Sequence, residues 1–586
     1  MKTLPTAEML KLKESQKLLL LSLLVGLCTG FAAVLLQALI GLVQAAVAPM
    51  TQSNSLWRIV LPGIGMLISG VLVRYVIKDN IGHGVTKVLL AVSTNDSRIK
   101  PHNMWSSVLT SALTIGFGGS VGAEAPIVYT GAAIGSNIGK AGKLSYRNMT
   151  ILVGCGAAGA IAGVFKAPLA GLLFTMEVLL FNVSLASMMP LLLSTVSATV
   201  VAYLFRGVGP SFECALAPFA LKNIPFYIVL GVVCGFMSLY FTRTTLKLED
   251  RLARIRKPWV RWAIAAVGVG LLVYLFPPLY GEGYGDVSIL LNGAIGEMGD
   301  SPLAFLTSSP WGLVAAFIVI MFVKVVSMTL TNAGGGVGGT FGPTLFVGAI
   351  VGFVVSRLLN VATGAALWDM PEPNFVLVGM AAMMAGVMQA PMTSIFLIAE
   401  ITGGYDLLVP LITASAVSFG VTRIWERYSI YTKRIAQSGE LLTHDSDQAV
   451  LTLLKTSDLV RDKYPRLELD ATLGEIMETV SNSTAAIFPV VGSDGIFQGV
   501  VEMDDIRKHM FDSAKYDSVR VFNLMKQPPA YVERDEKMSS VLDKFEKTGA
   551  WRLPVLDAQK HYLGFISKSR ILMAYREELK SISAED

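Results

Sequence analysis

Charged residues are scarce over most of this chain. Asp, Glu, Lys and Arg make up 16% of its 586 residues, while hydrophobic residues make up 53%. Charges are sparse from Leu18 to about Arg423 and dense from Lys433 to Asp586. Soluble globular domains carry about 25% charged residues. The sequence therefore predicts a polytopic membrane region followed by a soluble C-terminal region.

Cysteine and histidine are also rare. The four cysteines all lie in the apolar region, and the five histidines are scattered along the chain. These numbers argue against a disulfide framework. The sequence shows no metal-ligand spacing and no nucleophile paired with a base, so we expect neither an enzyme nor a bound cofactor. The net charge of +5 is too small to indicate nucleic-acid binding.

A convincing signal-peptide cleavage site is missing as well. The first apolar run, Leu18 to Val47, is too long for a signal-peptide core, so we expect a retained first helix. Basic residues precede this run and also fill the loop at 251–261. The positive-inside rule then places the N-terminus and this loop in the cytoplasm. We expect the C-terminal region to be cytoplasmic as well. These features favour a bacterial inner (plasma) membrane.

Two glycine-rich stretches stand out in the apolar region. One is GGSVGAEAPIVYTGAAIG, Gly118 to Gly135, and the other is GVGGTFGPTLFVGAIVG, Gly336 to Gly352. Aligning Pro126 with Pro343 gives the shared pattern G-x-(E/F)-x-P-x4-G-A-x2-G. Glycine and proline at these positions predict helices that break inside the membrane.

Two further pairs of segments echo each other in the same order. IVLGVVCGF (228–236) matches LLVGLCTGF (23–31), and GVMQAPMTSIFLIAE (386–400) matches GVFKAPLAGLLFTME (163–177). One such match could arise by chance in apolar sequence, but three in order indicate a duplicated half. Repeats in transporters usually run in opposite directions across the bilayer, with the substrate at their interface.

The two glycine-rich stretches contain no Lys or Arg. A backbone N–H at a helix start carries a partial positive charge and can hold an anion weakly enough for release. This favours an anion path over a cation path. The one carboxylate in these stretches, Glu124, is itself a tethered anion that can block such a site, and the alternative is that it only caps a helix.

The C-terminal region contains a repeat of its own. FPVVGSDGIFQGVVEMDDI (488–506) matches LPVLDAQKHYLGFISKSRI (553–571). Each unit predicts a strand, a turn, a strand and a helix, with a preceding helix at Leu473–Val480 or Met538–Thr548.

Taken in order, these motifs resemble those of the CLC family of chloride channels and chloride/proton exchangers. GAEAP (122–126) resembles the family's G-x-E-x-P, GTFGP (339–343) its G-x-F-x-P, GHGVT (82–86) its G-S-G-I-P, and SIYTKRIA (429–436) its last membrane helix. The C-terminal repeats resemble a pair of CBS domains. The resemblance covers essentially the whole chain.

The resemblance implies an α-helical polytopic membrane protein with an inverted-topology repeat and broken helices, followed by an α/β CBS tandem. The expected boundaries are a transport domain at 1–437, a linker at 438–455, and CBS domains at 456–514 and 515–586. It also implies a homodimer with one pore per subunit.

The same resemblance assigns residue roles. Glu124 would be the gating glutamate and chloride the transported ion. The central anion would be held by the backbone amides of Thr340 and Phe341 and the hydroxyl of Tyr431. Further anion-binding positions would be His83, Gly84, Ala123 and Ala125.

Three positions depart from the family pattern. His83 replaces an anion-binding serine and either donates a ring N–H or faces away, and Thr86 replaces a proline. Fluoride-selective relatives also depart at this motif, so other small anions stay open beside chloride. Ala123 replaces a basic residue, which weakens the outer positive field. Val178 stands where exchangers usually carry their inner proton-transfer acid.

The valine at this position favours a passive, voltage-gated type of chloride channel. A proton-coupled chloride/proton antiporter is the alternative, and a CBS-regulated transporter of another ion is a third. Glu177 and its repeat partner Glu400 are expected to be structural, bonding to a helix end or to a neighbouring polar group. In the CBS pair, only Asp505 and Ser567 keep parts of the nucleotide-binding pattern, which favours a packing or gating-coupling role over adenine nucleotide binding.

Overall fold

The structure is a computed structural model that describes residues 14–79, 81–82, 84–94, 97–179, 185–212, 214–294, 309–363, 370–438 and 454–583. The chain divides into two compact units, residues 1–441 and 442–586. The first unit has a large buried apolar core of its own, and the second unit contains separate smaller cores.

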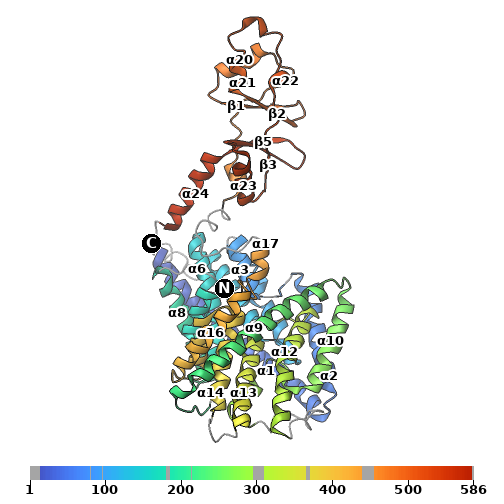
Figure 1. The fold of residues 1–586 in the computed structure, drawn as a ribbon, viewed down its shortest axis with the longest axis vertical. Coiled ribbons are helices and arrows are strands. Elements are labelled where there is room, and N and C mark those ends of the chain that lie inside the picture. Colours follow the sequence, from blue (N-terminus) through green and yellow to red (C-terminus); the bar gives the residue numbers. More distant parts are fainter. Residues whose placement is uncertain are drawn as a thin grey trace, which may run out of the picture. The chain divides into compact units, whose positions relative to one another are not determined.

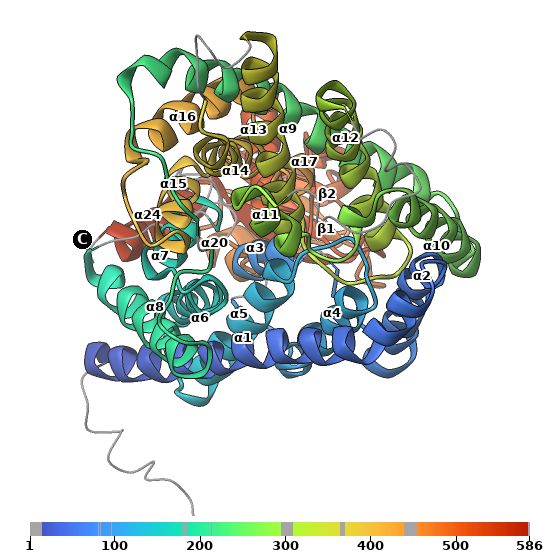
Figure 2. The same cartoon turned by 90° about the horizontal axis from the view of Figure 1, so that it is seen from below.

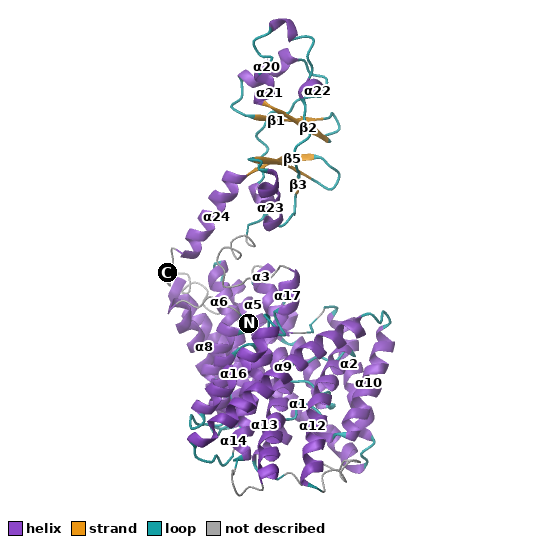
Figure 3. Cartoon of the chain, in the orientation of Figure 1, coloured by secondary structure: helices purple, strands orange, loops and turns teal. Residues whose placement is uncertain are grey.

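The first unit is helical (Figures 1 and 3). Among the described residues, nine of its helices are long and apolar enough to cross a membrane. The first half of the unit consists of α1 (Glu14–Ser53), α2 (Trp57–Val71) with its π-helical continuation η2 (Leu72–Ile77), α3 (Gly84–Thr94), α4 (Ser106–Gly116), α5 (Glu124–Ala141), α6 (Tyr146–Phe165), α7 (Pro168–Glu177) and α8 (Leu185–Arg206).

The second half repeats this arrangement. Its helices are α9 (Ile224–Ala253), α10 (Pro258–Leu275), α11 (Tyr284–Leu291), α12 (Pro310–Ala333), α13 (Phe341–Thr363), α14 (Glu372–Met388), α15 (Pro391–Ile401), α16 (Leu408–Trp425) and α17 (Lys433–Ser438). Helix α5 packs on α6 as α13 packs on α14, and α1 packs on α8 as α9 packs on α16. Figure 2 shows these two groups on opposite sides, with α7 beside α15 between them. The predicted inverted-topology repeat is confirmed.

Glycine makes the tightest helix crossing possible in both halves. A Cβ atom on Gly131 of α5 would lie 2.1 Å from the carbonyl oxygen of Gly156 on α6. In the second half, a Cβ atom on Gly348 of α13 would lie 2.5 Å from the carbonyl oxygen of Gly379 on α14. Both distances are too short for non-bonded atoms, so the backbones approach this closely only because glycine has no side chain.

Glu177 and Glu400 join the two halves reciprocally. The Glu177 carboxylate, at the end of α7, accepts hydrogen bonds from the backbone N–H groups of Met392 at 3.0 Å and Thr393 at 2.7 Å, in the first turn of α15. The Glu400 carboxylate accepts from the backbone N–H of Ala170 at 2.8 Å, in the first turn of α7. Helix starts leave such N–H groups without intrahelical partners. Both glutamates therefore make the helix-end contact expected for them.

The second unit contains the strands of the structure, drawn in orange in Figure 3. Its elements are α19 (Thr456–Leu459), α20 (Leu473–Ser481), β1 (Ile487–Val491), β2 (Phe497–Glu502), α21 (Met503–Arg507), α22 (Val521–Leu524), β3 (Val532–Glu533), α23 (Met538–Thr548), β4 (Arg552–Leu556), β5 (Tyr562–Ser567) and α24 (Lys568–Ser583). Strands β1 and β2 form one antiparallel sheet, and β3, β4 and β5 form a second sheet in that order.

The strand pair β1–β2 and the strand pair β4–β5 have equivalent registers. Pro489 pairs with Val500 across β1 and β2, and Pro554 pairs with Phe565 across β4 and β5. In each pair of strands a register shift follows two residues later. The predicted helix over 538–548 has the observed bounds, and the one over 473–480 ends a residue later than predicted. The sequence repeat of the C-terminal region is therefore a structural repeat.

Candidate functional site

The two glycine-rich loops meet through their backbones. The Gly122 N–H donates to the Gly339 carbonyl at 3.0 Å, and the Gly339 N–H donates to the Gly122 carbonyl at 2.7 Å, as an antiparallel bridge. Two residues beyond each glycine a helix begins, α5 at Glu124 and α13 at Phe341. The bridge therefore brings together two helix starts from opposite halves, each with the partial positive charge of its free N–H groups.

Glu124 lies at the start of its own helix but is bonded to the other half. Its side chain is buried, with 1% of its surface exposed. One carboxylate oxygen accepts the backbone N–H of Gly342 in α13 at 3.2 Å, and the other accepts the hydroxyl of Tyr284. A Cβ atom at Gly122 would lie 2.2 Å from this carboxylate. The first glycine of the motif therefore makes room for the glutamate side chain that follows it.

Two of the residues predicted to hold the central anion, Thr340 and Tyr431, are in contact. The Thr340 hydroxyl donates to the Tyr431 hydroxyl at 3.1 Å, and the Thr86 hydroxyl donates to the Tyr431 backbone carbonyl at 3.3 Å. Phe341 is buried against the ring of Phe165, with centroids 5.5 Å apart. These segments are far apart in the sequence, and the fold gathers them at one place.

A small cavity of about 40 Å³ opens beside Tyr431. A single water needs roughly 10–15 Å³ of such volume, so the cavity has room for a small ion or a few waters. The cavity is lined by Thr86, Thr245, Leu246, Glu249, Thr340, Ile430, Tyr431 and Arg434. Tyr431 is thus a buried residue beside a cavity rather than an interfacial aromatic anchor.

Of the remaining predicted anion-binding positions, the structure describes Ala123, Ala125 and Gly84 but not His83. Ala123 and Ala125 are buried at the start of α5. Gly84, the first residue of α3, packs against the same place, since a Cβ atom there would lie 2.2 Å from the Ala125 carbonyl oxygen. His83 lies outside the described residues.

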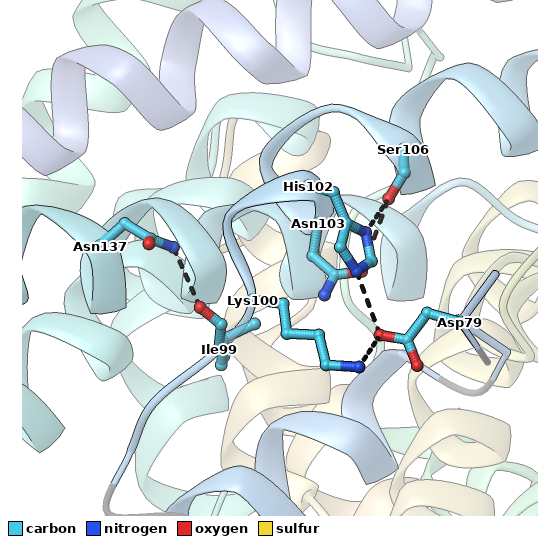
Figure 4. A network of polar contacts seen from close by, with 7 residues as sticks. All are labelled: Asp79, Ile99, Lys100, His102, Asn103, Ser106 and Asn137. Atoms are coloured by element: carbon cyan, nitrogen blue, oxygen red, sulfur yellow. Dashed lines mark hydrogen bonds and ion pairs between the residues drawn. The ribbon is translucent and has the colours of Figure 1, made fainter. Parts of the chain in front are cut away.

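A polar network holds the segment that precedes α3 (Figure 4). Asp79 accepts hydrogen bonds from the Lys100 ammonium at 2.9 Å and from the His102 ring at 3.1 Å. The backbone on this side is fixed to α5, because the Asn137 amide donates to the Ile99 carbonyl at 3.1 Å. Asp79, three residues before Gly82, is thereby linked to a segment that contacts the helix beginning with Glu124.

Val178 occupies the position at which exchangers of the resembling family usually carry an inner proton-transfer acid. It directly follows the last residue of α7, and 2% of its surface is exposed. Its neighbour Glu177 is engaged at the start of α15. This buried position therefore carries an aliphatic side chain that cannot bind a proton.

The structure adds three residues that the sequence reasoning missed. Glu282 accepts the backbone N–H of Ala123 at 2.9 Å, and Tyr284 donates to Glu124. Lys324, fully buried in α12, donates to the backbone carbonyl of Gly281 at 3.0 Å. The signal that could have found Lys324 is a lone cation inside a 24-residue apolar helix. Glu282 and Tyr284 lie in a short YGEGYGD stretch, which has no counterpart among the repeated motifs.

The two nucleotide-pattern residues of the second unit are engaged within the protein. The Asp505 carboxylate pairs with Lys526 at 2.6 Å and Lys508 at 3.0 Å. These two ammonium groups hold the pKa of Asp505 below its usual range. The Ser567 hydroxyl lies 3.3 Å from that of Ser569 and accepts the backbone N–H of Arg570 at 3.3 Å.

Within the part of the chain that the structure describes, no group of three or more His, Cys, Asp or Glu side chains is placed to hold a metal ion. The polar groups at the meeting point of α5 and α13 are two helix starts, hydroxyls and a buried carboxylate. Such groups bind and release small anions by hydrogen bonding.

Two inverted halves with broken helices that meet at a buried carboxylate define an integral membrane transport protein. The chain belongs to the voltage-gated chloride channel family, the CLC family, whose model matches residues 65–423. The CBS domain model matches residues 457–512 and 521–577, so the second unit is a CBS pair.

Known proteins with similar sequences and folds agree with this assignment. A voltage-gated ClC-type chloride channel, ClcB, from Citrobacter koseri is 29% identical over 389 residues, covering 65% of this chain and 87% of that protein. The crystal structure of a slow cyanobacterial Cl⁻/H⁺ antiporter has a TM-score of 0.62 at 23% identity, covering 72% of this chain and 97% of that one. A eukaryotic CLC transporter has a TM-score of 0.60 at 17% identity, covering 94% of this chain and 97% of that one.

Proposed function

We propose that this protein carries chloride across the membrane passively, through a path gated by Glu124. The observation that carries the proposal is the position of the Glu124 carboxylate, which is buried and bonded to the Gly342 N–H at the start of α13. A backbone N–H at a helix start is a ligand suited to a chloride ion. The carboxylate therefore stands in for the transported anion and blocks its site.

Opening requires that Glu124 leave this position. Its two bonds, to the Gly342 N–H and the Tyr284 hydroxyl, favour the ionised carboxylate. Protonation weakens both bonds and removes the negative charge that repels an entering anion. The site then contains hydrogen-bond donors, and neither glycine-rich stretch contains a lysine or arginine. Anion binding therefore stays weak enough for rapid release.

Val178 favours a passive channel over a proton-coupled antiporter, because an antiporter needs a proton route from the inner side to Glu124. The second candidate, antiport, is favoured by the titratable groups around Glu124, namely Tyr284 and Glu282. Those groups could deliver protons to Glu124 by a route that does not use position 178.

The setting of the protein is proposed from its family and charge pattern. The basic loop at 251–261 favours a cytoplasmic N-terminus and a cytoplasmic CBS pair, in a bacterial inner membrane. Membership of the CLC family favours a homodimer with one pore per subunit. The engaged Asp505 and Ser567 favour a gating-coupling role for the CBS pair over nucleotide binding.

The function is tested with purified protein in chloride-loaded liposomes under an imposed chloride gradient. Chloride efflux and external pH are recorded together, and both the wild type and Glu124→Ala are measured. The expected result is chloride efflux without coupled proton movement, and an efflux through Glu124→Ala that no longer depends on pH. Stoichiometric uphill proton movement would establish antiport instead. Absence of anion flux from both proteins would reject the transport function.

A further inference from the structure

A glycine-flanked turn, residues 281–284, packs onto the start of α5. Gly281 and Gly283 have φ values of +68° and +93°, a left-handed conformation that side chains disfavour. A Cβ atom on Gly283 would also lie 2.4 Å from the Phe346 ring of α13. The Gly281 N–H donates to the Gly118 carbonyl at 3.3 Å, in the loop that leads to α5. The turn is therefore held against both halves. The backbone of Glu282, which lies between the two glycines, is fixed in position.

The turn places two side chains on the gate. Tyr284 donates its hydroxyl to Glu124, and Glu282 accepts the Ala123 N–H at 2.9 Å. Each helix start is thus occupied by a carboxylate, α13 by Glu124 and α5 by Glu282. The two carboxylates differ in access, because Glu124 is buried whereas Glu282 is partly exposed.

The charges around Glu282 come from several elements. Lys324 of α12 is fully buried and donates to the carbonyls of Gly281 at 3.0 Å and Leu279 at 3.5 Å. Its ammonium lies 4.8 Å from the centroid of the Phe346 ring. The other charged or titratable groups that face Glu282 or Lys324 are Glu124 of α5, Arg206 of α8, and Tyr284 and Asp286 of α11.

Lys324 fixes the backbone of the turn rather than the carboxylate. Among the described residues, no ion pair within 4 Å joins its ammonium to Glu282, and the Glu282 side chain accepts its hydrogen bond from the Ala123 N–H. The carboxylate is therefore free to swing away by side-chain rotation while the turn stays in place. Its departure would leave an N–H group at the α5 start and a buried positive charge nearby, both of which attract an anion.

We infer that Glu282 is a second gating carboxylate, which occupies the Ala123 amide at the start of α5 and must leave before an anion can bind there. This inference rests on the proposed anion transport and adds a second, more exposed barrier in series with Glu124. An anion that enters from the side of Glu282 displaces Glu282 first and then reaches Glu124. The Lys324 charge compensates the entering anion as Glu282 withdraws.

Two substitutions separate the charge of Glu282 from its hydrogen bond. Glu282→Gln keeps an oxygen that accepts the Ala123 N–H but removes the charge, whereas Glu282→Ala leaves the amide without a side-chain partner. Asp406→Asn is the matched control, since Asp406 is an exposed carboxylate that is not among the charged groups facing Glu282 or Lys324. Chloride binding is measured by titration calorimetry in detergent, and chloride efflux is measured in liposomes.

Glu282→Ala is expected to bind chloride on the order of tenfold more tightly and to pass it faster, because a tethered competitor and a like charge are both removed. Glu282→Gln is expected to gain less, since its amide still competes for the Ala123 N–H. Asp406→Asn is expected to change both quantities less than twofold. A role confined to pinning α5 would leave chloride affinity unchanged.

The inference is overturned if Glu282→Gln and Glu282→Ala both bind and conduct chloride like the wild type while Glu124→Ala conducts faster. That result leaves the proposed function standing. An unfolded Glu282→Ala together with a wild-type Glu282→Gln would show a structural pin and would equally overturn it. If no variant and no wild type moves any anion, the proposed function fails with it.

Discussion

At the scale of single residues, the molecule solves the problem of an ionised side chain inside a membrane protein. A buried carboxylate needs hydrogen-bond donors to remain charged. Glu124 receives one from the backbone of α13 and one from Tyr284, so both of its donors come from the half of the unit to which it does not belong. The position of this carboxylate is therefore coupled to the contact between the halves.

Tyr284→Phe is expected to speed chloride efflux several-fold. The substitution removes a donor to Glu124 but keeps the ring, whose centroid lies 6.3 Å from that of Phe165. With one bond fewer, the carboxylate leaves its blocking position more readily. Tyr280→Phe is the control, because the buried Tyr280 hydroxyl has no hydrogen-bond partner among the described residues. Equal efflux from both variants would contradict a holding role for Tyr284.

Asp505→Asn is expected to loosen the first CBS repeat at neutral pH. Lys526 and Lys508 lower the pKa of Asp505 in the folded chain. The stability that this pairing contributes is therefore present above the unfolded pKa of about 4 and is lost as the pH falls through the lower folded value. Hydrogen exchange at 497–510 should be faster in the variant at pH 7, and its difference from the wild type should shrink toward pH 3. A constant difference would argue against this charge pairing.

At the scale of elements, each half of the repeat supplies hydrogen-bond partners for backbone groups of the other half. The last residue of α7, Glu177, and the penultimate residue of α15, Glu400, each bond the start of the opposite helix. The loops before α5 and α13 bond through two glycines. Broken helices leave backbone groups without partners, which is tolerated in a membrane only where neighbouring protein satisfies them. Neither half could satisfy these groups alone.

Gly131→Ala is expected to destabilise the first unit strongly. The added Cβ would lie 2.1 Å from a backbone oxygen of α6, which cannot move as a flexible side chain could. The helices must separate, and we expect a loss of about 1–3 kcal/mol or failure to purify as a monodisperse protein. Gly41→Ala in α1 is the control, since a Cβ there meets nothing within 4 Å. Thermal unfolding in detergent compares the two, and similar melting temperatures would refute the close crossing.

Glu177→Gln is expected to lower the melting temperature of the first unit. The amide keeps one acceptor, while the carboxylate serves two backbone N–H groups and the Thr393 hydroxyl. Leaving a buried donor unpaired costs about 1–3 kcal/mol. Glu546→Gln is the control and should have no effect. It makes the same substitution on the exposed face of α23, at a glutamate without a hydrogen bond or ion pair among the described residues. Indistinguishable melting curves would mean that Glu177 is not holding α15.

At the scale of the whole molecule, a transport unit and a CBS pair are joined in one chain, and each has its own apolar core. The CBS pair repeats its strand register closely but not the residues that would bind a nucleotide. The first repeat has Glu502 where a hydroxyl is usual, and the second has Arg570 where an acid is usual. The tandem therefore keeps its fold without a complete copy of that binding pattern in either repeat.

Adenine nucleotides are expected to leave the thermal unfolding of the full chain unchanged. A ligand that binds only the native state raises the melting temperature, and the rise continues as the ligand concentration exceeds its dissociation constant. ATP and AMP are each titrated to millimolar concentration, with unfolding followed in detergent. A concentration-dependent rise that Asp505→Asn abolishes would show a nucleotide site and reject the packing role.

The sequence by itself determined the features that repeat or that depend on local chemistry. Glycine and proline at matching intervals identified the broken helices, and three matching pairs of segments in the same order identified the duplication. Glu124 was the one carboxylate in the two glycine-rich stretches. The CBS helices at 473–480 and 538–548 followed from apolar periodicity and turn residues, and the structure has them with bounds that differ by at most one residue. Such signals lie within a few turns of chain, where neighbouring residues determine the local conformation.

Only the tertiary structure decided which groups surround Glu124. Its partners Gly342 and Tyr284 lie 218 and 160 residues away, and Glu282 reaches the Ala123 amide from 159 residues away. No local pattern marks such pairs, because their approach depends on how two halves pack rather than on the residues beside them. Lys324 is visible as a lone cation in an apolar helix, but its hydrogen bond to the Gly281 carbonyl exists only once α12 lies against the turn. The sequence therefore singles out Glu124, and packing determines what holds its carboxylate.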